Sequence, residues 1–253
     1  MPVRPRSTTK HRAGYTRAIA IPPGGAALLH DGEPVTPRQA ATVLLYRHAP
    51  ELELLFVQRP GGADFAAGAW VFPGGSVHAE DENQPDPHRS AAVRELFEEA
   101  GVLFARHQGR FATADEAASV RDRVAQGRGY VLALSALGLV PAVEELVYFA
   151  RWITPEVVRK RFDTRFYLAP LPEGQSVHPQ PGEVVDWRWA APRAVLEDES
   201  FNLVFATRRV LESVVAEPHL EVFIERARGL AEIAAVQPRI VRAADGSMSI
   251  EVD

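Results

Sequence analysis

The stretch RELFEEAGV, residues 94–102, gathers three carboxylates on one side of a predicted helix. At 100° per residue its apolar side chains share one side, whereas Glu95, Glu98 and Glu99 lie on the other with Arg94 at the flank. Like charges at these spacings cost a helix about 0.2–0.5 kcal/mol per pair, and Arg94 offsets only the Glu98 contribution. Three convergent oxygens suit a hard divalent cation such as Mg²⁺ or Mn²⁺. We therefore predict a metal site on this face, with an ordinary solvated acidic face as the alternative.

The segment GAWVFPGG, residues 68–75, precedes this helix. Residues 70–72 are aromatic and β-branched, which predicts a short strand, and residues 73–75 predict a sharp turn after it. Glycines let the backbone approach a ligand closely, because no Cβ intrudes. The Gly74 carbonyl is therefore a candidate fourth oxygen around the cation.

Together the two segments resemble the signature of the Nudix hydrolases, which is Gly, five residues, Glu, seven residues, and Arg-Glu-apolar-x-Glu-Glu-x-Gly-apolar. Residues 94–102 match its second half in full, and Gly75 resembles its first glycine. Here 18 residues separate Gly75 from Arg94, five more than in the signature. The isolated acidic residue of the signature is left with two positions: counting back from Arg94 gives Asp86, and counting forward from Gly75 gives Asp81.

The resemblance implies roles for the residues of this signature. Glu95, Glu98 and Glu99 would hold the metal with the Gly74 carbonyl, and Arg94 would orient the glutamates through a salt bridge. Because the glutamates are then occupied, the base that deprotonates the attacking water should come from a loop elsewhere.

Two loop glutamates are candidates for that base. Glu183 is the first, since it follows a proline- and glycine-rich loop and precedes a predicted strand at 184–189. Glu145, beside Glu144 and just before a predicted strand at 146–153, is the alternative. For each of them, an ordinary solvated loop glutamate is the competing interpretation.

Residues 68–75 also resemble part of a signature specific for coenzyme A, although the arginine of that signature is replaced here by Asp64. The segment 162–167 and a long predicted insertion are similar to those of the larger, coenzyme A diphosphatase-like branch of the family. The candidate substrate contacts are Arg59, Phe72, Gly75, Arg165 and His178.

The length, net charge and composition of the chain limit the classes of protein to which it can belong. The chain has 253 residues, a net charge of −5, no cysteine, and no apolar run long enough to span a bilayer. We expect a cytoplasmic protein that binds a small nucleotide-derived molecule, without nucleic acid or membrane partners, and leave a homodimer open. Residues 1–17 are expected to be a mobile basic tail and residues 18–253 one domain.

Hydrophobic patterns predict irregular alternation of strands and helices, which indicates an α/β or α+β protein with a mixed sheet. The resemblance implies an α/β/α sandwich, and the helical pattern of residues 105–141 indicates a helical insertion or lid. The remaining expected strands span 40–47, 52–59 and 165–169. The expected helices span 87–100, with a start near Pro87 or Ser90, 114–126, 130–139, 191–196, 207–216 and 221–234. A short helix is expected to open at Thr154, and a polar tail to follow 234.

The resemblance implies a metal-dependent hydrolase that cleaves the diphosphate of a nucleoside diphosphate derivative, such as coenzyme A, acyl-coenzyme A, NADH, ADP-ribose or a nucleotide sugar. The first alternative is a nucleotide-binding regulatory module on the same fold with little turnover. Such modules usually lose a glutamate of the signature, whereas Glu95, Glu98 and Glu99 are all present. A protein-interaction scaffold is the second alternative, supported only by the basic tail and the insertion.

Overall fold

The computed structural model describes residues 18–20, 28–62, 66–180 and 182–252. The expected basic tail, 1–17, and Asp64 lie outside the described residues. None of the described helices is long and apolar enough to cross a bilayer.

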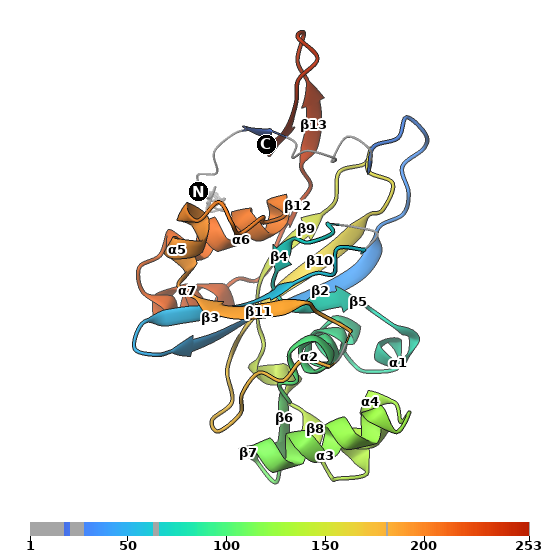
Figure 1. Ribbon diagram of the computed structural model, residues 1–253, viewed down its shortest axis with the longest axis vertical. Coiled ribbons are helices and arrows are strands. Elements are labelled where there is room, and N and C mark those ends of the chain that lie inside the picture. The colour runs from blue at the N-terminus through green and yellow to red at the C-terminus, as the bar shows by residue number, and fades with distance from the viewer. Residues whose placement is uncertain (1–17, 21–27, 63–65, 181, 253) are drawn as a thin grey trace, which may run out of the picture.

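A mixed sheet of eight strands lies at the centre of the molecule (Figure 1). Its main path is β11–β3–β2–β10–β9–β12, while β4 pairs with β3 and β5 pairs with β2. The β2–β10 and β9–β12 pairs are parallel, and the other pairs are antiparallel. The strands are β2 (Arg38–His48), β3 (Leu52–Gln58), β4 (Trp70–Val71), β5 (Gly74–Ser76), β9 (Val147–Ile153), β10 (Phe162–Pro170), β11 (Asp186–Ala190) and β12 (Ala235–Val236).

Helices cover both faces of this sheet, which confirms the predicted α/β/α sandwich (Figure 1). Side chains alternate along β2, so that Val43 and Leu45 pack toward α2 (Pro87–Ala100), while Leu44 packs in the core on the other face. That second core is shared with α5 (Pro192–Glu197), α6 (Phe205–Val215) and α7 (Leu220–Arg228).

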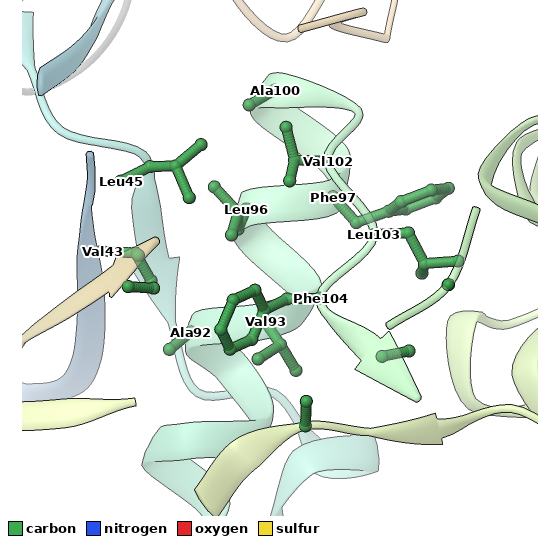
Figure 2. Packing of buried hydrophobic residues seen from close by; sticks show 14 of the residues in the cluster. Val43, Leu45, Ala92, Val93, Leu96, Phe97, Ala100, Val102, Leu103 and Phe104 are labelled. Atoms are coloured by element: carbon green, nitrogen blue, oxygen red, sulfur yellow. The ribbon is translucent and has the colours of Figure 1, made fainter. Parts of the chain in front are cut away.

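The helix α2 begins and ends where the sequence predicts. Asp86 caps it by accepting a hydrogen bond from the Arg89 amide at 3.1 Å, and Pro87 occupies its first turn. Gly101 ends it in the left-handed conformation, at φ 67°. Leu96 points from α2 toward Val43 and Leu45 in Figure 2, and this fully buried face fixes the direction of the opposite, acidic face.

The insertion at 105–141 contains strands as well as the predicted helices. The strands β6 (Ala105–His107), β7 (Arg110–Phe111) and β8 (Val140–Pro141) form a small sheet, and α3 (Ala114–Ala125) and α4 (Tyr130–Ser135) pack beside it. The helix α4 is shorter than the predicted 130–139, because Gly138 turns the chain at φ 65° toward β8. The ring of Tyr130 packs on Phe97 of α2, with 5.4 Å between centroids.

The expected helix 221–234 is too long, because α7 ends at Arg228, and two other predicted features are wrong. No helix opens at Thr154, because its amide donates to the Phe162 carbonyl at 2.9 Å and its hydroxyl accepts from the Phe162 amide at 3.0 Å. Those bonds extend the turn that joins β9 to β10. The C-terminal part is also not a polar tail, since β13 (Arg239–Arg242) and β14 (Met248–Glu251) form a hairpin that pairs with β1 (Ala18–Ala20).

Candidate active site

Arg94 is the centre of the site, and its side chain is fully buried. Its guanidinium lies 2.8 Å from Asp81, 2.9 Å from Glu95 and 2.8 Å from Glu98, and it donates to the Ser76 carbonyl at 2.9 Å. Charge-assisted bonds of this kind are strong and directional. Arg94 therefore has the contacts expected of a residue that orients the glutamates.

Of the two candidate positions for the isolated acidic residue, Asp81 is the one that contacts Arg94. Its carboxylate is 1 % exposed and accepts hydrogen bonds from Arg94, the Ser90 hydroxyl and the His78 amide. Asp86 is instead the cap of α2 and pairs with Arg89 at 3.3 Å. The extra residues therefore follow Asp81, at the end of the short helix α1 (Ala79–Glu82) and in the link to α2.

Gly74 and Gly75 belong to β5 rather than to the predicted turn, because they pair with β2. A Cβ on Gly75 would lie 2.4 Å from an oxygen of Glu95, so this carboxylate sits directly against the backbone. The Gly74 amide donates to Glu99 at 2.9 Å. Gly75 is therefore needed so that the Glu95 carboxylate can approach the strand, whereas Gly74 is needed because a Cβ there would lie 2.4 Å from the Ala41 carbonyl of β2.

Burial raises the pKa of Glu95, Glu98 and Glu99, which we call the box glutamates. Burial raises the pKa of Glu99 most, to about 8, against the opposing Gly74 hydrogen bond and with a further increase from the Glu95 charge. For Glu95 and Glu98 the nearby Arg94 opposes the effect of burial, yet the pKa of each stays raised.

The donor set fits a hard divalent cation, because buried carboxylate oxygens outnumber the neighbouring cations and a metal would offset their repulsion. Arg94 donates to one oxygen each of Glu95 and Glu98, and the Gly74 amide donates to one oxygen of Glu99. Over the described ranges, no three acidic or histidine side chains are grouped tightly enough to form a ready metal cluster.

The loop that carries Glu183 runs along the C-terminal end of α2. The His178 amide donates to the Ala100 carbonyl at 2.8 Å, and the Gln180 amide donates to the Glu98 carbonyl at 3.2 Å. Glu183 is exposed, and its charge acts on all three box glutamates. The structure thus brings Glu183 to the site, while the exposed His178 side chain instead contacts Ser176 at 2.8 Å.

Glu145 lies elsewhere, at the end of the 3-10 turn Val143–Glu145. Its carboxylate pairs with Arg106 of the insertion, as does Glu144 at 3.2 Å. This turn contacts the N-terminal end of α2, where Arg89 donates to the Val143 carbonyl at 2.5 Å. The alternative base is therefore engaged away from the box glutamates.

A cavity of about 700 Å³ adjoins the carboxylates at β5. Gly74, Gly75 and Ser76 line it, and Glu95 and Glu99 approach the same two glycines. Its walls are mainly apolar, and no carboxylate or histidine lines it among the described residues. The cations at the cavity are Arg38, Arg59 and Lys160, and the larger apolar residues include Trp152, Phe162, Phe166, Phe205, Ile240 and Ile250.

The predicted substrate contacts divide between this cavity and other places. Arg59 and Gly75 line it, and the Arg59 charge acts on Glu99. Phe72 also lines it but is 1 % exposed and packs on Phe56, with 5.0 Å between centroids. Arg165 lies on the opposite face of β10, where its guanidinium stacks over Tyr148 at 5.6 Å.

Several cavity residues were not singled out from the sequence. Arg38, Trp152 and Phe205 belong to three elements that meet only in the folded chain. The alternation of β2 gives a partial signal, since Arg38, Ala40 and Thr42 all line the cavity.

Comparison with known proteins agrees with the resemblance to Nudix hydrolases. The model of the NUDT19 Nudix domain matches residues 84–207. The chain is 30% identical over 162 residues to putative nudix hydrolase 7 of Caenorhabditis elegans, a match that covers 64% of this chain and 54% of the relative. It is 37% identical over 123 residues to the human acyl-coenzyme A diphosphatase NUDT19, covering 43% of this chain and 33% of the relative.

A solved structure shares the architecture. The NUDIX hydrolase from Alicyclobacillus acidocaldarius is 27% identical, with a TM-score of 0.64, and the match covers 76% of this chain and 96% of that one. The chain spans about half of the length of the C. elegans relative and a third of the human one. Taken with the fold and the arrangement around Arg94, these similarities support membership of the chain in the Nudix hydrolase family.

Proposed function

We propose that this protein is a metal-dependent hydrolase that cleaves the diphosphate linkage of a nucleoside diphosphate derivative. The observation that carries the proposal is the junction at β5, where buried carboxylates adjoin a large cavity whose described lining contains cations but no acidic side chain. An anionic substrate suits such a cavity, and its diphosphate would lie at β5 beside the glutamates.

The residues divide the chemical work between them. Glu95, Glu98 and Glu99 would hold Mg²⁺ or Mn²⁺, and Arg94 keeps two of these carboxylates in place. When bound, the divalent ion neutralises phosphate charge and eases the deprotonation of water. Glu183 would accept the proton of the attacking water, whose oxygen joins one phosphorus as the bond from that phosphorus to the bridging oxygen breaks. The products are two phosphate monoesters.

Within this class we propose coenzyme A or an acyl-coenzyme A as the first substrate to test. The cavity combines aromatic and aliphatic walls with Arg38, Arg59 and Lys160, which suits an anion that carries apolar groups. The human relative named above is an acyl-coenzyme A diphosphatase. NADH, ADP-ribose and nucleotide sugars are the competing substrates.

A substrate panel tests the proposal. The protein is incubated with coenzyme A, acyl-coenzyme A, NADH, ADP-ribose, nucleotide sugars and diadenosine polyphosphates, with Mg²⁺, with Mn²⁺ or with EDTA, and products are identified by mass spectrometry. We expect a nucleoside monophosphate or its 3′-phosphorylated counterpart from at least one compound, only with metal. Binding of a compound without turnover would instead favour the nucleotide-binding regulatory module.

A further inference from the structure

The phenol of Tyr130 is a buried polar group without a hydrogen-bond partner among the described residues. Tyr130 is the first residue of α4 in the insertion, and its side chain is almost completely buried. Buried hydroxyls nearly always have a partner, and an apparent exception commonly marks an ordered water or ion. Neither the metal chemistry nor the cavity described above uses this residue.

The side chain of Tyr130 packs against the helix that carries the box glutamates. Its ring stacks on Phe97, which directly precedes Glu98, with 5.4 Å between centroids. The preceding residue, Gly129, lies close to Glu80, because a Cβ there would be 3.6 Å from the Glu80 carboxylate. Glu98 is also the charged group that most strongly raises the pKa of Tyr130, after the effect of burial.

One carboxylate oxygen of Glu98 lacks a hydrogen-bond donor among the described residues. Its Oε2 accepts from Arg94 at 2.8 Å, whereas no donor from the described ranges reaches Oε1. The Glu98 side chain is 28% exposed, which is more than that of Glu95, so water has access to it. A buried donor without an acceptor therefore belongs to a side chain that packs on the residue before Glu98, and one oxygen of Glu98 lacks a donor among the described residues.

A second unsatisfied polar group belongs to Gln180, whose backbone contacts the backbone of Glu98. The side-chain amide nitrogen of Gln180 is buried and has no hydrogen-bond partner among the described residues. Its backbone amide donates to the Glu98 carbonyl at 3.2 Å, which places the residue next to Glu98. Two separate segments that contact α2 at Phe97 and Glu98 thus each leave a buried polar group unsatisfied, as a bound water would require.

We propose that Tyr130 is a positioning residue whose hydroxyl donates to an ordered water, and that this water donates to Oε1 of Glu98. The insertion 105–141 would then hold the Glu98 carboxylate through α4, while Arg94 holds its other oxygen. Groups that orient a metal ligand in this way commonly change metal affinity when they are removed. The inference rests on the proposed function, because it assigns Glu98 to the metal.

Tyr130→Phe removes only the hydroxyl and keeps the ring on Phe97. We expect it to raise the Mn²⁺ dissociation constant by about tenfold, measured by electron paramagnetic resonance of free Mn²⁺. The matched control is Tyr167→Phe, a buried tyrosine of the same core whose charged neighbours are Asp86, Arg165 and Arg89 rather than box glutamates. It should change the dissociation constant by less than about twofold. Equal effects of the two variants, or no effect of Tyr130→Phe, would overturn the proposal.

A double-mutant cycle in EDTA tests the link without metal or substrate. Tyr130→Phe should lower the melting temperature by about 2–4 °C in the wild type and by much less in the Glu98→Ala background, because the bridge is already lost there. Equal shifts in both backgrounds, or a higher melting temperature for Tyr130→Phe alone, would show that the hydroxyl does not act through Glu98. If the wild type binds no Mn²⁺, the proposed function fails, and this cycle still decides the role of Tyr130.

Discussion

Replacing Arg94 by methionine tests how the carboxylates of the site are held. The side chain is fully buried and contacts Asp81 at 2.8 Å and Glu95 at 2.9 Å, both of which are themselves almost fully buried. Methionine fills much of the space but supplies neither charge nor donors. Removing one partner of a buried ion pair costs about 3–5 kcal/mol, because the remaining charge stays buried without compensation. Glu98 adds little to this loss, since its side chain is partly exposed.

The assay is urea unfolding of the metal-free protein in EDTA, followed by circular dichroism. We expect Arg94→Met to lower the free energy of unfolding by about 3–5 kcal/mol. Adding Asp81→Asn to Arg94→Met should recover part of the loss, because it removes the most deeply buried of the orphaned charges. The control Arg226→Met breaks an exposed pair with Glu217 at 3.4 Å and should cost less than about 1 kcal/mol. A loss below about 1 kcal/mol for Arg94→Met, or no recovery in the double variant, would refute the reasoning.

Three further predictions concern individual residues of the site. Glu98→Gln should lower turnover by about two orders of magnitude or more at unchanged circular dichroism, and unchanged activity would rule out its metal role. Since the pKa of Glu99 is raised to about 8, its contribution to stability is complete below pH 4.5 and is lost as the pH rises through 8. The free energy of unfolding in EDTA should therefore fall by up to about 5 kcal/mol over this range, and Glu99→Gln should remove most of that fall. Gly75→Ala should displace Glu95 and destabilise the protein by about 1–3 kcal/mol in urea, whereas Gly61→Ala, where a Cβ meets nothing within 4 Å, should be nearly neutral.

Local sequence signals predicted the helix that carries the box glutamates and the hairpin beside it. The helix 87–100 has an early proline, an apolar face and a terminal glycine, and its bounds in the structure are the same. The hairpin of β2 and β3 was also predicted, because its strands are dense in β-branched and apolar residues. These features depend on neighbours within a few residues along the chain.

Features set by distant contacts could not be predicted in the same way. Asp81 and Asp86 were equivalent by counting, and only the buried position of Arg94 distinguishes them. The strand character of Gly74 and Gly75 comes from pairing with β2, which overrides the usual preference of glycine for turns. The cavity joins β2, β9, β10, α6 and the C-terminal hairpin, so its residues carry no common local pattern.

The direct test of the central claim is an equilibrium titration of the protein with Mn²⁺, read by electron paramagnetic resonance. We expect saturable binding by the wild type and dissociation constants at least about tenfold higher for Glu95→Gln, Glu98→Gln and Glu99→Gln. The exposed loop variant Glu173→Gln should bind like the wild type. No saturable binding at millimolar Mn²⁺, or equal affinities in all four variants, would contradict the assignment of the box glutamates to a divalent cation.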